Sequence, residues 1–130
     1  ARVFLGFAGG NTILIYLMIT VIILLAGMFM ETASALIILT PIFLPTIIQV
    51  GGNLVHFGVL ISIGLAIGMA TPPVAIDIYV ASAITGLPIE QISKPIVPMV
   101  AVLIGVLVLV TYVPSIILSL PLLVWGPAGI

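Results

Sequence analysis

The chain has 130 residues, of which 64% are hydrophobic and 4% charged, and its formal net charge is −1. A soluble domain carries about 25% charged residues, so this composition predicts an integral membrane protein. Cysteine is absent and there is one histidine, which excludes disulfides, thiol catalysis and a multi-histidine metal site within the chain. Two basic residues provide no electrostatic surface for nucleic acid.

The first long apolar stretch covers residues 11–49 and is interrupted by Glu31 and Thr32. Residues 11–30 are long enough, at roughly 1.5 Å per residue, to span a bilayer core, and the second half is apolar again. We therefore expect a helical hairpin. It either spans the membrane with a tight turn or is re-entrant and stops inside it. Residues 1–10 are expected to form a loop or the end of a preceding helix.

The second apolar stretch, residues 55–85, contains the adjacent prolines Pro72 and Pro73. Each proline lacks an N–H, and Pro73 drives Pro72 out of the α region. The pattern predicts a broken helix, whose first part ends near Gly68 and whose second part begins near Pro73. Non-helical backbone at membrane depth is tolerated where it is buried in protein or lines a wet cavity. This break, with Asp77 just after it, is the expected working site.

The last part of the chain is expected to be a polar loop at 86–94 followed by a closing transmembrane helix at 95–120. The continuous apolar runs favour helices over a barrel, so the fold class is an all-α integral membrane protein. Lys94 favours a cytoplasmic loop by the positive-inside rule, although Arg2 then lies on the other side. The absence of an initial methionine and of a polar tail leads us to expect a fragment, with residues 1–130 forming a single membrane domain.

The hairpin tip and the helix break share one arrangement, in which one helix ends and another begins at membrane depth. Helix C-termini present unpaired carbonyls and helix N-termini present unpaired N–H groups. Carbonyls together with the hydroxyls of Thr32, Ser34 and Thr71 suit a hard cation such as Na⁺. The N–H groups near Ser34 and Val74 suit a carboxylate. Many secondary transporters build their midplane sites in this way.

Two acidic residues, Glu31 and Asp77, each allow two interpretations. Glu31 is a ligand for substrate or proton, or a turn acid at the membrane surface. Asp77 is an ion or coupling site, or an acid that the helix dipole favours in a first turn. The backbone ends, with Thr71 and Thr32, rank above Asp77 as expected ligands.

Several short motifs follow one another in a recognisable order: Gly27 with Glu31-Thr32-Ala33, Pro41-Ile42-Phe43-Leu44-Pro45, His56-Phe57-Gly58, Gly68-Met69-Ala70-Thr71-Pro72-Pro73, and finally Pro114 and Pro121. Over about residues 11–123 this order resembles the C-terminal part of the large membrane subunit of TRAP transporters, the tripartite ATP-independent periplasmic transporters. The resemblance implies one of two inverted repeats of an elevator-type transporter. One departure is that Ala75 follows Val74 where the family often has glycine.

The resemblance also implies Na⁺-coupled import of an organic acid, such as a C4-dicarboxylate or sialic acid. A periplasmic substrate-binding protein and a small membrane subunit would be the partners, in the bacterial inner membrane, where the chain would cross the lipid bilayer several times. Na⁺ would be the coupling ion, with no other cofactor. The implied Na⁺ site comprises Gly27, Glu31, Thr32, Gly68, Ala70, Thr71 and Pro72, and the implied substrate site comprises Ser34, Pro73, Val74 and Asp77.

Two other functions remain open from the residues themselves. One is a proton-coupled antiporter or ion channel that uses Asp77 as a titrating site. The other is a membrane assembly subunit that transports nothing. An enzyme is not expected, because the sequence contains no evident nucleophile–base pair.

Overall fold

The computed structural model describes residues 2–9, 11–72 and 74–126, and within these residues every regular element is an α-helix. This confirms the all-helical expectation. The helices are α1 (Arg2–Ala8), α2 (Thr12–Phe29), α3 (Thr32–Gln49), α4 (Leu54–Ala70), α5 (Ile76–Thr85), α6 (Ile89–Tyr112) and α7 (Pro114–Trp125). Among them α2, α3 and α6 are long and apolar enough to cross a membrane.

The helical hairpin consists of α2 and α3, which are joined only by Met30 and Glu31. The side chain of Asn11 begins α2 by accepting a hydrogen bond from the N–H of Ile13 at 3.1 Å. Both helices have 18 residues and are therefore about 27 Å long. A turn that contains Gly51, with φ +72°, leads from α3 to α4.

The broken helix consists of α4 and α5. Asn53 caps α4 by accepting hydrogen bonds from the N–H groups of Val55 and His56, at 2.8 and 3.2 Å. The helix ends at Ala70 and α5 begins at Ile76. The break therefore starts and ends two to three residues later than the proline pattern indicated, because the last turn of α4 continues up to the residues before the prolines.

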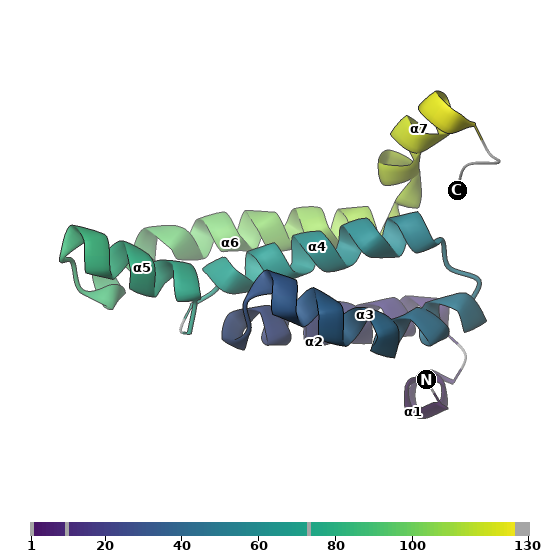
Figure 1. The fold of residues 1–130 in the computed structure, drawn as a ribbon, viewed down its shortest axis with the longest axis horizontal. Helices are drawn as coiled ribbons and strands as arrows, with labels where there is room; N and C mark the ends of the chain where they lie inside the picture. The colour runs from purple at the N-terminus through teal and green to yellow at the C-terminus, as the bar shows by residue number, and fades with distance from the viewer. Residues whose placement is uncertain (1, 10, 73, 127–130) are drawn as a thin grey trace.

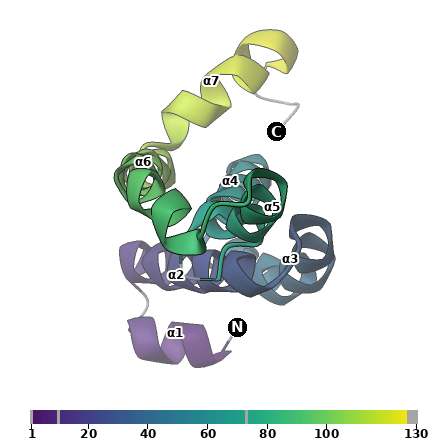
Figure 2. The ribbon, with the colours of Figure 1, turned by 90° about the vertical axis from the view of Figure 1, so that its left-hand side faces the viewer.

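Figure 2 shows α2 and α3 in one layer, with α4 and α5 above them and α6 alongside. The most extensive packing is between α2 and α4, and α4 also packs against α3 and α6. Figure 1 shows that α5 and the start of α6 extend beyond the tip of the hairpin. The break in the second helix therefore lies level with the hairpin tip rather than at the end of the bundle.

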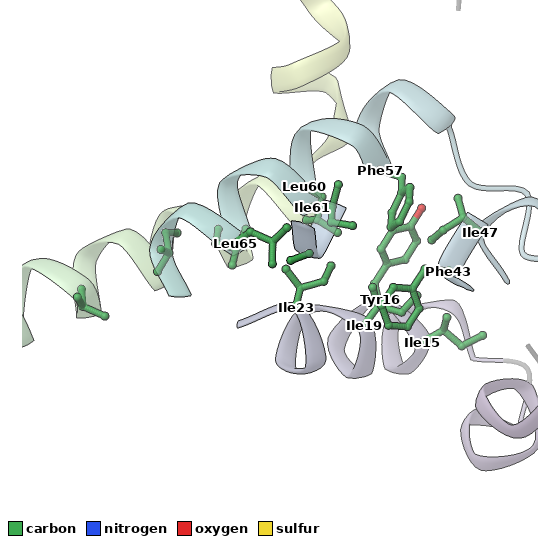
Figure 3. Packing of buried hydrophobic residues seen from close by; sticks show 14 residues of the cluster. Ile15, Tyr16, Ile19, Ile23, Phe43, Ile47, Phe57, Leu60, Ile61 and Leu65 are labelled. Carbon is green, nitrogen blue, oxygen red and sulfur yellow. The ribbon is translucent and has the colours of Figure 1, made fainter. Parts of the chain in front are cut away.

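The core joins α2, α3 and α4, and Val100 and Leu107 of α6 also belong to it. Residues spaced by four on α2 (Ile15, Ile19 and Ile23) form one buried stripe, as expected for one face of a helix. In Figure 3 this stripe faces Phe43 of α3 at one end and Leu65 of α4 at the other. The core thus holds the hairpin against the first half of the broken helix.

The structure corrects two expected boundaries in the last third of the chain. Residues 89–94, expected in a loop, form the first turns of α6, so that Gly86, Leu87 and Pro88 alone connect α5 to α6. The partly buried side chains of Ile89, Ile92 and Ile96 follow helical spacing, and this explains why a segment with two charges is still a helix.

The closing helix, expected as one segment at 95–120, is two helices. Tyr112 ends α6, Val113 links the two helices, and Pro114 begins α7. The proline lacks the N–H that would continue α6, and it suits a first helical position. The short α1 at the beginning of the chain is also a helix where a loop or helix end was expected.

Candidate functional site

The hairpin tip contacts the helix break directly. Thr32, the first residue of α3, donates a hydrogen bond from its hydroxyl to the sulfur of Met69, at 2.6 Å. These residues are 37 positions apart, and Met69 lies in the last turn of α4. The two predicted halves of the site are therefore adjacent in space.

Close packing of two glycines makes this contact possible. A Cβ atom added to Gly27 of α2 would lie 2.7 Å from the carbonyl oxygen of Leu65, and one added to Gly68 of α4 would lie 2.7 Å from the Cα of Gly27. Both glycines are buried, and both lie within the last turn of their helix. The C-terminal ends of α2 and α4 are thus brought together, with their carbonyl groups on the same side of the bundle.

Thr71 closes α4 at the break. Its N–H donates to the carbonyl of Gly68 at 3.0 Å, and its hydroxyl donates to the carbonyl of Ile67 at 2.7 Å. Its own backbone is extended, with φ −83° and ψ 119°. A hydroxyl that donates its hydrogen keeps its oxygen lone pairs, so Thr71 can still act as an acceptor toward a cation. Ala70 and Pro72 on either side are partly buried.

At the hairpin tip, Glu31 is the N-cap of α3. Its carboxylate accepts hydrogen bonds from the N–H groups of Ala33 and Ser34, at 3.0 and 3.2 Å, and from the Ser34 hydroxyl at 3.3 Å. The two backbone hydrogen bonds hold the pKa of the Glu31 carboxyl below its ordinary value. The N–H of Ser34, expected to bind a substrate carboxylate, is thus already bound to a carboxylate of this chain.

The N-terminus of α5 differs from the N-terminus of α3 in its capping. Ala75 is its buried N-cap residue and makes no side-chain cap hydrogen bond. Its φ of −48° is ordinary for an L-residue, so glycine is not needed there. The first-turn N–H groups belong to Ile76 and Asp77 rather than to Val74, which precedes the helix. Asp77 is exposed, whereas Pro73 lies outside the described residues.

A groove lies beside the break, and α6 forms its other wall. It has a volume of about 270 Å³ and is lined by Thr71, Pro72, Val97, Val100, Ala101 and Ile104. The four α6 residues were not predicted as part of the site from the sequence. Their spacing of three, one and three positions is that of one helical face, and this pattern could have identified them as a face turned toward another element.

No group of three His, Cys, Asp or Glu side chains comes together among the described residues. Backbone carbonyls and hydroxyls, which are present at the tip and the break, are ligands of the kind that hard cations take. The structure places Gly27 against Gly68 and Thr32 against Met69, while Thr71 and Pro72 line the groove beside the break.

The family model and the three relatives named below, which match this chain, all belong to one family of transporters. Residues 1–116 match the family described as "Tripartite ATP-independent periplasmic transporter, DctM component". The chain is 47% identical, over 82% of its length, to the isethionate TRAP transporter permease protein DctMQ of Oleidesulfovibrio alaskensis. It is 39% identical, over 88% of its length, to the C4-dicarboxylate TRAP transporter large permease protein DctM of Rhodobacter capsulatus.

A third relative is the sialic acid TRAP transporter large permease protein SiaM of Vibrio cholerae, with 34% identity over 89% of this chain. The chain covers 17%, 26% and 27% of the length of these three relatives, so it spans about a quarter of such a protein or less. No solved structure matches the chain. The names of these relatives describe transport proteins and not enzymes, in agreement with the expectation from the sequence.

Proposed function

Because the chain belongs to the DctM component family of tripartite ATP-independent periplasmic transporters, we propose that it is the C-terminal repeat of a Na⁺-coupled importer of an organic acid. Family membership and the three long apolar helices make it a membrane-embedded transporter subunit. The observation that carries the proposal is the contact between Thr32 at the hairpin tip and Met69 at the helix break.

In the proposed site, Na⁺ binds between the ends of α2 and α4. The carbonyl ends of both helices carry partial negative charge, and the packing of Gly27 against Gly68 places these ends side by side. Thr71 adds a hydroxyl oxygen and a carbonyl. A bound cation offsets the two negative helix ends and holds the tip against the break.

The organic anion binds at the start of α5 in this proposal. Glu31 already accepts hydrogen bonds from the N–H groups at the start of α3, so the partial positive charge at that N-terminus is already compensated. The N-terminus of α5 has no side-chain cap, and its N–H groups favour an anion. Asp77, in the first turn of α5, adds a negative charge beside that position and would restrict which anions fit.

The remaining features are proposed from the family. The three relatives named above are designated for isethionate, C4-dicarboxylate and sialic acid, all of them organic anions. We propose that a periplasmic binding protein delivers the substrate and that a small membrane subunit accompanies the chain in the bacterial inner membrane. The extension of α5 and α6 past the hairpin tip (Figure 1) supports a re-entrant hairpin within an elevator-type repeat.

Transport in proteoliposomes tests the ion-coupling proposal. The full-length transporter and its binding protein are supplied with C4-dicarboxylate, sialic acid and isethionate in turn, in Na⁺ or in choline. We expect uptake in Na⁺ and loss of uptake in choline. Thr71→Ala should lower the apparent Na⁺ affinity by about tenfold or more, as for loss of a ligand to a charged group.

Thr85→Ala is the matched control, because Thr85 also donates its hydroxyl to a carbonyl four residues earlier, Ala81, at 2.7 Å. Thr85 lies at the far end of α5 from the break. The Na⁺ affinity of the Thr85→Ala transporter should therefore equal that of the wild type. Uptake that continues unchanged in choline would contradict Na⁺ coupling. An unaltered Na⁺ affinity in Thr71→Ala would remove Thr71 from the site.

A further inference from the structure

The end of α6 contains a backbone carbonyl that its own helix cannot satisfy. In a continuous helix the carbonyl of Val110 would accept a hydrogen bond from the N–H of residue 114. Residue 114 is proline and has no N–H, so the last bond of this ladder is the one from the N–H of Val113 to the carbonyl of Leu109, at 2.8 Å. Val110 is buried, and an unpaired buried carbonyl is costly.

The side chain of His56 supplies the missing donor. Its Nε2 lies 2.8 Å from the carbonyl oxygen of Val110, 54 positions away in the sequence. Because a carbonyl oxygen only accepts, Nε2 carries the hydrogen. His56 is 3% exposed, so this bond is shielded from water.

His56 is itself held in place on two sides. Its backbone N–H is bound by the cap residue Asn53. Its ring packs against the ring of Tyr16 on α2, with the ring centroids 5.7 Å apart. The bond to Val110 therefore joins the capped first turn of α4 to the last turns of α6.

This bond fixes the position of α6 along α4. His56 and Thr71 are 15 residues apart at the two ends of α4, about 22 Å along the helix axis. The face of α6 that contains Ala101 lines the groove beside Thr71. A shift of α6 along its axis would therefore change the wall of the groove at the break.

We propose that His56 is a positioning residue, which donates the hydrogen bond that Pro114 cannot donate and thereby holds α6 against the helix break. The link from this position to ion binding depends on the function proposed above. The position of α6 does not depend on that function, so the positioning role of His56 and the proposed function can fail separately.

Cross-linking across the groove measures the position of α6. The chain has no cysteine, so the pair Thr71→Cys and Ala101→Cys introduces its only thiols, in a full-length transporter freed of any other cysteine. The rate of oxidative cross-linking is compared with and without His56→Phe, which keeps a ring and removes the donor. We expect a fall of about fivefold, the effect of one hydrogen bond. His56→Gln, which retains an N–H donor, should stay near the original rate.

Tyr112→Phe is the matched control, because it removes the hydrogen bond from the Tyr112 hydroxyl to the Ile13 carbonyl, at 3.3 Å, at the same end of α6. It should leave the cross-linking rate unchanged. An unchanged rate in His56→Phe, or an equal fall in Tyr112→Phe, would overturn the proposal.

A variant with a restored backbone donor covers the case in which His56→Phe does not fold. Pro114→Ala provides the N–H that Val110 lacks, so adding it to His56→Phe should recover folding and cross-linking. Failure of this double variant to recover either would also overturn the proposal. Na⁺ affinity, measured on cysteine-free His56→Phe protein, should fall if the proposed ion site is correct. A normal Na⁺ affinity with slow cross-linking would reject only the link to ion binding.

Discussion

In an apolar medium a hydroxyl group must find its hydrogen-bond acceptor within the protein. Thr20 and Thr111 donate to the carbonyl four residues earlier in their own helix, and Thr71, just after α4, does the same to Ile67. Thr32 instead donates across the bundle to Met69. Hydroxyls of the first kind reveal little about tertiary structure, whereas the exceptional one identifies a contact between distant segments.

Thr46 is the opposite exception, because its hydroxyl oxygen is fully buried and has no hydrogen-bond partner in the part of the chain that the structure describes. A buried hydroxyl without a partner is destabilising. Thr46→Val, which keeps the shape, should raise the free energy of unfolding by about 1 kcal/mol.

Reversible unfolding in detergent measures this change. Thr20→Val serves as the control, since Thr20 is also buried but its hydroxyl is bonded at 2.8 Å; this variant should gain nothing. Destabilisation by Thr46→Val would show that the Thr46 hydroxyl has a partner, and equal stabilisation of both variants would show that the gain does not come from an unpartnered hydroxyl.

Glu31 predicts a pH dependence at the hairpin tip. Its folded-state pKa is lowered from the ordinary 4.5 by the hydrogen bonds from Ala33 and Ser34. The ionised cap therefore contributes stability above about pH 4.5, and this contribution is lost as the pH falls through the lower, folded-state pKa. Glu31→Gln should lower the melting temperature at pH 7, and the difference from the wild type should shrink in acid.

Melting curves from pH 7 down to pH 3 test this expectation. Glu90→Gln is a suitable comparison, because Glu90 lies in the first turn of α6, a helix whose N-cap makes no side-chain hydrogen bond. It should change the melting temperature less at pH 7. A difference between Glu31→Gln and wild type that is the same at every pH would rule out the ionised cap.

At the scale of elements, the helix ends of this chain carry the specific features, which are side-chain caps and a proline at a first helical position. Asn11, Glu31 and Asn53 begin helices with side-chain caps, while Pro114 occupies the first position of α7. The central helix α4 then contacts α2, α3, α5, α6 and α7. Its last turn, where Gly68 meets Gly27, is the point at which the hairpin and the broken helix are joined.

Gly68→Ala tests this junction. The added methyl group would meet backbone atoms of Leu24 and Gly27 at 2.7 Å, and backbone cannot move aside as a flexible side chain can. The substitution should cost about 2 kcal/mol of stability, as overpacking does, and it should weaken Na⁺ binding by separating the tip from the break.

Gly105→Ala is the control, because a methyl group added to this helical glycine meets nothing within 4 Å. Replacing a helical glycine by alanine should stabilise the protein by about 0.5 kcal/mol. Thermal unfolding and Na⁺ titration of both variants measure the effects. Equal tolerance of alanine at the two positions would mean that the glycine contact is not close.

At the scale of the whole molecule, the chain presents large apolar side chains over much of its surface. Val102, Val106 and Leu109 on α6 are exposed, as are Leu120 and Leu123 on α7. A bilayer accepts such faces, since lipid tails are as apolar as a protein core. The buried core joins α2, α3 and α4 and includes Val100 and Leu107 of α6, and the most extensive packing of two helices is between α2 and α4.

The sequence by itself determined the membrane class, the hairpin and the break, because hydrophobicity and the missing proline N–H are properties of neighbouring residues. It placed the end of α4 within two residues and the start of α5 within three, and its prediction that Thr32 and Thr71 are ligands stays a prediction. Only the tertiary structure decided which partners these groups meet. The contacts of Thr32 with Met69 and of His56 with Val110 join residues 37 and 54 positions apart. Such contacts depend on how whole helices pack, and no local pattern encodes them.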